Sequence, residues 1–197
     1  MKAALFDYGT GNLHSLEKAL EASGASVDIG SDLPVLIDAA EVLVLPGVGA
    51  FGPAAARLEP YAALLRSAIN SGLPTLGICL GMQLLFDSSE EGPGKGLGIF
   101  EGEVTALTAQ RVPHIGWNTL DGCRDRLIEK AHITTAYFAN GFACRPSDPE
   151  IIQAWTEHDG DRFPAAVRRG HVVGVQFHPE KSSGAGLAFL RSFLEEV

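Results

Sequence analysis

The 197-residue sequence has few cysteines and no cluster of basic residues. Its three cysteines, Cys79, Cys123 and Cys144, include no Cys-x-x-Cys spacing, so neither a disulfide framework nor a structural zinc site is expected. The sequence has 24 acidic and 15 basic residues, a formal net charge of −9, and no run of Lys or Arg. Nucleic acid is therefore not the expected main partner, because phosphate binding needs a clustered positive surface.

Long hydrophobic segments are also missing. Gly and Pro interrupt the longest apolar stretches, so no membrane span is expected. The first apolar run ends at Asp7 and is too short for the core of a signal peptide. Together with the sparse cysteines, these features predict a protein of the reducing cytoplasm without membrane association. The composition, 46% hydrophobic and 20% charged, is typical of a globular chain.

The first half of the sequence alternates short apolar runs with segments of helical periodicity. Strands are expected at residues 3–6, 27–29, 42–45 and 75–79. Helical segments are expected at residues 13–23, 34–40 and 53–70. The run Val42–Leu45 is continuously apolar, which is typical of a parallel strand covered on both faces. This alternation predicts an α/β fold, a flavodoxin-like doubly wound and mostly parallel sheet.

The second half of the sequence has a different pattern. Strand-like runs separated by turn signals are expected at residues 99–107, 133–138, 151–155, 165–168 and 172–177. They indicate an additional antiparallel portion joined to the parallel core. A last helix is expected over residues 185–195. Because no repeat, low-complexity tract or linker divides the chain, we expect a single domain over residues 1–197.

The stretch from Leu73 to Phe86 predicts a strand that turns sharply into a helix at Cys79, between Gly77 and Gly81. Such an elbow leaves no room for Cβ atoms beside its apex, and the helix behind it directs free N–H groups at the sulfur, which favours the thiolate. Cys79 is thus a candidate nucleophile. The alternative is a cysteine that simply fills the core, since free cysteine is among the most buried residue types.

His178 and Glu180 are the candidate partners of this nucleophile. Residues i and i+2 of an extended chain face the same side, so the carboxylate is expected to reach one ring nitrogen. Pro179 is expected to keep the segment from coiling into a helix. In a triad the carboxylate orients the histidine, whose other nitrogen takes the nucleophile's proton. The alternative is a surface polar pair.

The segment Pro46–Gly49 is a candidate oxyanion site. It follows the strand at 42–45, and loops at the carboxyl ends of parallel strands gather at one edge of the sheet. Backbone N–H groups of Val48 or Gly49, together with that of Leu80, are expected to point at a developing negative charge. The alternative is a plain turn before a helix.

The segments Gly77–Gln83 and His178–Glu180 resemble those of the class I, or triad, glutamine amidotransferases. Four further segments resemble, within that family, the glutaminase subunits of imidazole glycerol phosphate synthase, which serve histidine biosynthesis; these are residues 7–12, 46–52, 112–118 and 178–182. The resemblance covers essentially the whole chain.

This resemblance implies glutamine hydrolysis through a cysteine thioester. Cys79 attacks the side-chain amide and His178 protonates the departing ammonia. The residues implied to hold the substrate are Gly47, Val48, Gly49, Leu80, Gln83, Asn140 and Gly141. By its position alone, Gln83 could equally face solvent on its helix. The family usually has a His-Ser pair where this chain has Asn140-Gly141, which affects glutamine binding if side chains matter there.

The resemblance also implies a heterodimer with a cyclase subunit similar to a (β/α)₈ barrel, to which ammonia passes through a tunnel. Residues at the family's docking positions are Asn12, Trp117, Asn118 and Lys181. A tryptophan in a strand-rich region is at least as often a core residue. No metal and no cofactor are implied. Two alternatives are a stand-alone cysteine hydrolase, disfavoured by the docking motifs, and a non-catalytic binding module, disfavoured by the intact triad.

Overall fold

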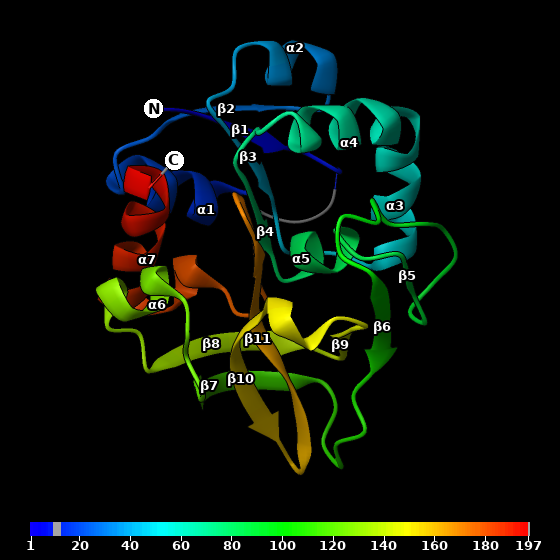
Figure 1. The fold of residues 1–197 in the computed structure, drawn as a ribbon, viewed down its shortest axis with the longest axis vertical. Coiled ribbons are helices and arrows are strands. Elements are labelled where there is room, and N and C mark those ends of the chain that lie inside the picture. Colours follow the sequence, from blue (N-terminus) through cyan, green and yellow to red (C-terminus); the bar gives the residue numbers. More distant parts are fainter. Residues whose placement is uncertain (10–12, 197) are drawn as a thin grey trace.

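In the part of the chain that the computed structural model describes, residues 1–9 and 13–196, the largest element is a seven-stranded sheet (Figure 1). Its strand order is β10-β11-β12-β4-β3-β1-β2. These strands are β1 (Lys2–Phe6), β2 (Ser26–Gly30), β3 (Val42–Leu45), β4 (Thr75–Ile78), β10 (Ile152–His158), β11 (Asp161–Arg169) and β12 (Val172–Val175).

The sheet has a parallel part and an antiparallel edge. Strands β2, β1, β3, β4 and β12 are parallel to one another, in the order of a flavodoxin-like doubly wound fold. Strands β11 and β10 follow as antiparallel neighbours. The predicted fold class is therefore confirmed, and the carboxyl ends of β3, β4 and β12 meet at one edge of the sheet.

Helices cover both faces of the sheet (Figure 1). One side carries α1 (His14–Ala22), α6 (Arg126–Ala131) and α7 (Ser183–Glu196), and the other carries α3 (Phe51–Leu58), α4 (Ala62–Asn70) and α5 (Leu80–Leu84). The short helix α2 (Leu33–Asp38) follows β2. Strand β3 is buried on both faces, since Val42 and Val44 pack into one core and Leu43 and Leu45 into the other.

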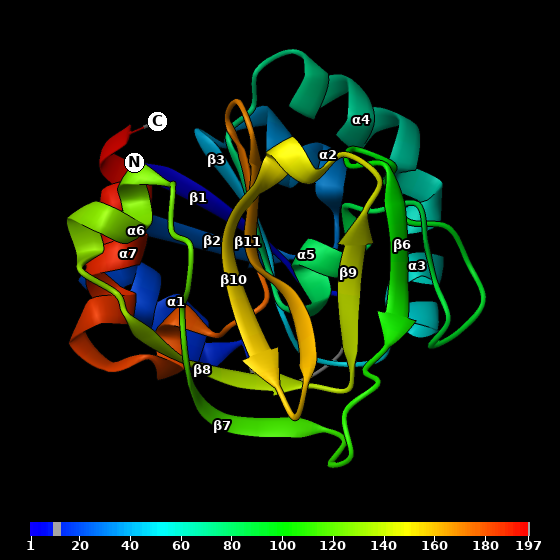
Figure 2. The ribbon, with the colours of Figure 1, turned by 60° about the horizontal axis from the view of Figure 1, so that its bottom comes forward.

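Two smaller sheets complete the fold (Figure 2). One contains β5 (Ser88–Ser89), β6 (Gly102–Ala106) and β9 (Phe142–Pro146), and the other is the hairpin of β7 (His114–Thr119) and β8 (Thr135–Asn140). The antiparallel portion is thus larger than predicted, because β7 and β9 were not expected, and neither was the helix α6. In β7, exposed residues alternate with buried or partly buried ones, so the strand has no continuous apolar run that would reveal it.

The helical stretch expected over residues 53–70 is broken in the structure. A 3₁₀ turn at Glu59–Tyr61 separates α3 from α4, because Pro60 has no N–H to donate within a helix.

None of the helices in the described part of the chain has the length and apolar character that a membrane span requires.

Candidate active site

Cys79 lies at a strained turn between β4 and α5. Its φ of 49° and ψ of −104° are unusual for a residue with a side chain. A Cβ on Gly77 would lie 2.7 Å from the carbonyl oxygen of Gly81, and a Cβ on Gly81 would collide with the carbonyl oxygen of Leu45. The predicted elbow, with glycines where backbone segments pass closely, is therefore confirmed.

His178 and Glu180 meet as predicted, but through a different backbone conformation. His178 Nδ1 and Glu180 Oε1 are 2.8 Å apart, and the His178 side chain is only 2% exposed. His178 is extended, with φ −102° and ψ 99°, whereas Pro179–Lys181 form a 3₁₀ turn. The expectation that Pro179 would prevent coiling was wrong, because proline is well suited to the first position of a helical turn, where its missing N–H is not needed.

The pKa of His178 is set by competing effects. Burial lowers it, but hydrogen bonds to Cys79 and Glu180 outweigh burial and raise the pKa to about 10. The imidazole therefore carries a proton at neutral pH. Since an imidazolium ion favours an adjacent thiolate, this arrangement suits nucleophilic chemistry at the sulfur.

The sulfur borders a cavity of about 180 Å³ at the carboxyl edge of the sheet. All seven residues predicted to hold the substrate line this cavity, as do His178 and Lys181. The prediction missed three residues of the cavity wall, Glu91, Ala139 and Phe142, and the neighbouring residue Gln176. Gln176 Nε2 lies 3.4 Å from the Cys79 Sγ. In the sequence it is a glutamine two positions before His178, directly after the apolar run Val172–Val175, and this position alone does not indicate a role at the site.

Gln83 and Asn140 are buried, each with 4% of its surface exposed, so the solvent-facing interpretation of Gln83 is wrong. Both side-chain amides donate to the carbonyl oxygen of Phe142, at 3.1 Å from Gln83 and 3.0 Å from Asn140. Within the described part of the chain, Asn140 Oδ1 is buried without a hydrogen-bond partner. This oxygen leaves an acceptor available in the cavity wall.

The segment Pro46–Gly49 packs directly against the elbow. A Cβ on Gly47 would lie 2.5 Å from the Ile78 carbonyl oxygen and 3.0 Å from the Cys79 Cβ. Gly49 has a φ of 118°, which side chains rarely tolerate. The candidate oxyanion loop is thus adjacent to the nucleophile, on the wall of the same cavity.

The predicted docking residues do not all lie on one face of the molecule. Trp117 is 53% exposed, so it is not a core residue. It packs edge-on against Tyr137, over whose ring the Lys181 Nζ lies at 5.9 Å. Asn118 points to the other face of β7, where its Nδ2 donates to the Glu157 carbonyl oxygen at 2.8 Å, and Asn12 lies outside the described residues.

The exposed face of β7 also carries Ile115, 66% exposed, which the prediction missed. Ile115 and Trp117 are two positions apart and therefore share one face of the strand. Figure 2 shows β7 at the outer margin of the molecule. We refer to Ile115, Trp117, Tyr137 and Lys181 as the hairpin surface.

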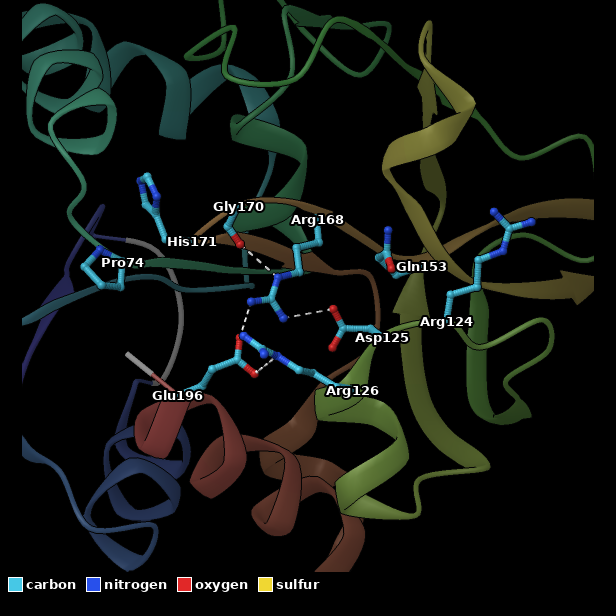
Figure 3. Close-up of a pocket in the computed structure, with 9 residues that line it drawn as sticks. All are labelled: Pro74, Arg124, Asp125, Arg126, Gln153, Arg168, Gly170, His171 and Glu196. Atoms are coloured by element: carbon cyan, nitrogen blue, oxygen red, sulfur yellow. Dashed lines mark hydrogen bonds and ion pairs between the residues drawn. The ribbon is translucent and has the colours of Figure 1, made fainter.

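A larger hollow, of about 670 Å³, lies at the opposite edge of the sheet (Figure 3). It includes Pro74 and His171, which directly precede β4 and β12. At its centre Arg168 pairs with Asp125 and Glu196, and Arg126 also pairs with Glu196. Burial raises the pKa of Glu196, but the two guanidinium groups outweigh it and hold the pKa below its ordinary value. These paired charges link β11, α6 and α7.

A cysteine elbow and a buried histidine–glutamate pair at the carboxyl edge of a doubly wound sheet are the groups expected of a hydrolase of the cysteine-triad type. Residues 4–197 match the family model of the class-I glutamine amidotransferases. The chain is 45% identical to the imidazole glycerol phosphate synthase subunit HisH of Pyrococcus furiosus, covering 98% of this chain and 97% of that protein. It is 43% identical to HisH of Thermosynechococcus vestitus, and the match covers 98% of this chain and 96% of that protein. The chain therefore belongs to the class-I glutamine amidotransferase family and, within it, to the HisH subunits.

Solved structures support the same fold. A crystal structure of a glutamine amidotransferase superposes with a TM-score of 0.78 at 21% identity, covering 98% of this chain and 97% of that one. The structure of PurLQS from Thermotoga maritima gives a TM-score of 0.79, also at 21% identity, with 99% and 98% covered.

Proposed function

We propose that this chain is the glutaminase subunit of an imidazole glycerol phosphate synthase. It hydrolyses glutamine to glutamate and ammonia at Cys79 and delivers the ammonia to a cyclase subunit in histidine biosynthesis. The observation that carries the proposal is that Cys79 and His178 line one cavity whose wall contains buried amide groups, with Glu180 paired to His178 behind it. The HisH relatives, similar over their full length, support the same assignment.

In the first chemical step, the Cys79 sulfur attacks the carboxamide carbon of glutamine. The electron pair of the C=O bond moves to the oxygen, which becomes an oxyanion. The backbone N–H of Leu80 and those of the loop Val48–Gly49 are our candidates to stabilise that charge. His178, protonated at neutral pH, is the proton donor to the departing nitrogen, and ammonia leaves as the C–N bond breaks.

The second step hydrolyses the γ-glutamyl thioester that remains on Cys79. His178, now neutral, takes a proton from water, whose oxygen attacks the thioester carbon. The C–S bond then breaks, glutamate departs, and the sulfur regains its electron pair. Glu180 orients His178 and stabilises its imidazolium form, as the carboxylate of a triad does.

The buried amides of the cavity wall are suited to hold the amino-acid end of glutamine. Asn140 Oδ1 is an unpartnered acceptor among the described residues, so an α-ammonium group is a fitting donor for it. Gln83 and the backbone at Gly141 border the same space. On this account, the Asn-Gly pair replaces the family's usual His-Ser pair without loss of substrate binding.

The cyclase partner is proposed to cover the hairpin surface. Trp117 and Ile115 expose apolar area there, and exposed aromatic residues are common anchors of protein interfaces. Lys181 connects this surface to the cavity, because it lines the cavity and lies over Tyr137. Ammonia has to reach the partner without entering bulk water, where protonation would destroy its nucleophilicity. A reducing cytoplasm remains the expected location.

Two alternatives predict different behaviour. A stand-alone cysteine hydrolase would act at full rate without a partner, and a binding module would not act at all. The intact triad disfavours the second, and the exposed apolar face of β7 disfavours the first.

The test is glutamate release from glutamine with and without the cyclase subunit and its nucleotide ligand. We expect slow release by the chain alone and acceleration by the partner, because docking would bring the loop Pro46–Gly49 into its oxyanion-binding shape. Trp117→Ala is expected to weaken the partner's binding by about tenfold or more. Val35→Ala is the control, since Val35 is 67% exposed on α2, away from the hairpin surface. Full activity without a partner would contradict the proposal.

A further inference from the structure

Gln176 is a polar side chain buried completely beside the nucleophile. It directly follows β12, and none of its surface is exposed (0%). Its Nε2 donates a hydrogen bond to the Cys79 Sγ at 3.4 Å. Alternate residues of an extended segment point to the same side, so Gln176 and His178 share one side of the chain, and His178 lines the same cavity as Cys79. Phe177 between them packs in the other direction, against Phe138.

The direction of this hydrogen bond follows from a chain of hydrogen bonds that begins at the backbone carbonyl of Phe142 and passes through Gln83 to Gln176. The Phe142 oxygen can only accept, and it accepts from Gln83 Nε2 at 3.1 Å. The same nitrogen also donates to Gln176 Oε1, at 3.3 Å. The oxygen of Gln176 is thereby occupied as an acceptor, so its NH₂ group must be the part that faces Cys79.

We propose that Gln176 is a second hydrogen-bond donor to Cys79 and that, with His178, it holds the sulfur as a thiolate directed into the cavity. A thiol is a weak acceptor, whereas a charged acceptor forms hydrogen bonds about twice as strong as a neutral one. Since a buried N–H without a good acceptor is costly, the fixed amide favours the ionised sulfur. The proton lost by Cys79 resides on His178, and Gln176 remains neutral and keeps both amide protons.

This inference rests on the proposed glutaminase function and assigns Gln176 a place in both of its steps. The donor stabilises the sulfur before attack. Once the thioester has formed, the sulfur is uncharged and the hydrogen bond weakens. During hydrolysis the C–S bond breaks and negative charge returns to the sulfur, so the same N–H group stabilises the leaving thiolate.

The first test is Gln176→Met, which keeps the length of the side chain and removes the donor. The readout is the pH at which alkylation of Cys79 by iodoacetamide reaches half its maximal rate, followed at the Cys79 peptide by mass spectrometry in the full chain. We expect this midpoint to rise by about one pH unit, with an about tenfold slower reaction below it. A merely space-filling Gln176 would leave the midpoint unchanged.

Gln153→Met is the matched control. Gln153 is also a glutamine, but it lies in the hollow at the opposite edge of the sheet, where its amide contacts the carbonyl oxygens of Glu150 and Ile151. This variant is expected to keep the alkylation midpoint of the unmodified chain.

A second measurement requires no change at Gln176, so it holds even where Gln176→Met does not fold. In ¹⁵N-labelled protein, the Gln176 side-chain amide signals are expected to shift over the same pH range in which Cys79 becomes reactive. In Cys79→Ala they are expected to stay constant over that range.

An unchanged midpoint in folded Gln176→Met, or amide signals that do not respond to Cys79, would overturn the inference even where the unmodified complex releases glutamate. Absence of glutamate release by the unmodified complex would instead refute the proposed function. The two failures are therefore distinguishable.

Discussion

At the scale of single residues, the site depends on a backbone conformation that Cys79 would not adopt by itself. A non-glycine residue with positive φ costs of order 1–3 kcal/mol. The close packing of Gly47, Gly77 and Gly81 around the elbow holds this conformation in place. Cys79 is thus positioned by residues that contribute no functional side chain.

Gly47→Ala tests this packing. The added Cβ would lie 2.5 Å from the Ile78 carbonyl oxygen, so either the loop or the elbow must move. We expect the kcat of glutamate release by the complex to fall by about 100-fold, since a displacement of about 1 Å has that effect on a catalytic group. Gly184→Ala is the control, because no atom of the described residues lies within 4 Å of its Cβ position. An unchanged kcat in Gly47→Ala would show that the elbow tolerates movement.

The residues of the triad could be predicted from the sequence, whereas Gln176 could not. Cys79, with its flanking glycines, and His178, with Glu180 two positions later, each fit a pattern with a known physical reason. A buried glutamine has no such pattern, because its role depends on which carbonyl fixes the amide's orientation. That carbonyl belongs to Phe142, which is far from Gln176 in the sequence.

At the scale of elements, the β7–β8 hairpin contains an acid-sensitive contact. The His114 ring stacks on His158 at 4.1 Å and on Phe138 at 5.2 Å between centroids. Burial first, and then the charge of His158, lower the pKa of His114 from 6.5 to about 4, although Asp159 opposes them. Folding therefore favours the neutral form of this imidazole.

His114→Phe tests this dependence. Between pH 6.5 and about 4 the unfolded chain binds a proton at His114 that the folded chain excludes, so the free energy of unfolding falls as the pH falls through this window. Phenylalanine keeps the ring stack without titrating, and we expect its unfolding free energy, measured by urea denaturation, to vary less over that window.

His132→Asn is the control, because His132 is exposed and its left-handed conformation suits asparagine. It should keep the pH dependence of the unmodified chain. Equal slopes in the unmodified chain and in His114→Phe would contradict the assignment.

A strand buried on both faces was predicted with its exact bounds, whereas the partly exposed strand β7 was missed. Val42–Leu45 is apolar at every position, and its strand has the expected bounds. Strand β7 exposes alternate residues, two of which belong to the hairpin surface, so its sequence contains no continuous run of apolar residues. The 3₁₀ turns that contain Pro60 and Pro179 differ from expectation because proline's effect depends on its position within a turn.

At the scale of the whole molecule, one edge of the sheet carries the candidate active site and the opposite edge carries a cluster of ion pairs. The carboxyl edge carries Cys79 and His178, and the amino edge carries the ion-pair cluster of Arg168, Asp125 and Glu196 (Figure 3). This cluster ties the last turn of α7 to α6 and β11. Because α7 directly follows the 3₁₀ turn that holds Glu180, the cluster anchors the far end of a helix that begins at the site.

Arg168→Met is expected to destabilise the fold without entering the chemistry. The side chains of Arg168, Asp125 and Glu196 are 16%, 4% and 10% exposed, so removal of the cation leaves two nearly buried carboxylates less well paired. Breaking a partly solvated pair of this kind costs about 2 kcal/mol in unfolding free energy. The comparison is Arg111→Met, which removes a guanidinium group that is 82% exposed in its pair with Asp159 and should change stability much less. Equal stability of the two variants would show that the cluster contributes little.

The central claim is that Cys79 supplies ammonia and nothing else to the complex. The measurement that tests it most directly is product formation by the complex of Cys79→Ala with the cyclase subunit, with glutamine or with ammonium salt as the nitrogen source. We predict that glutamine-dependent synthesis is abolished and that ammonia-dependent synthesis remains at the level of the unmodified complex. Loss of both activities would contradict the account, because Cys79 would then be needed for the structure of the complex rather than for glutamine hydrolysis.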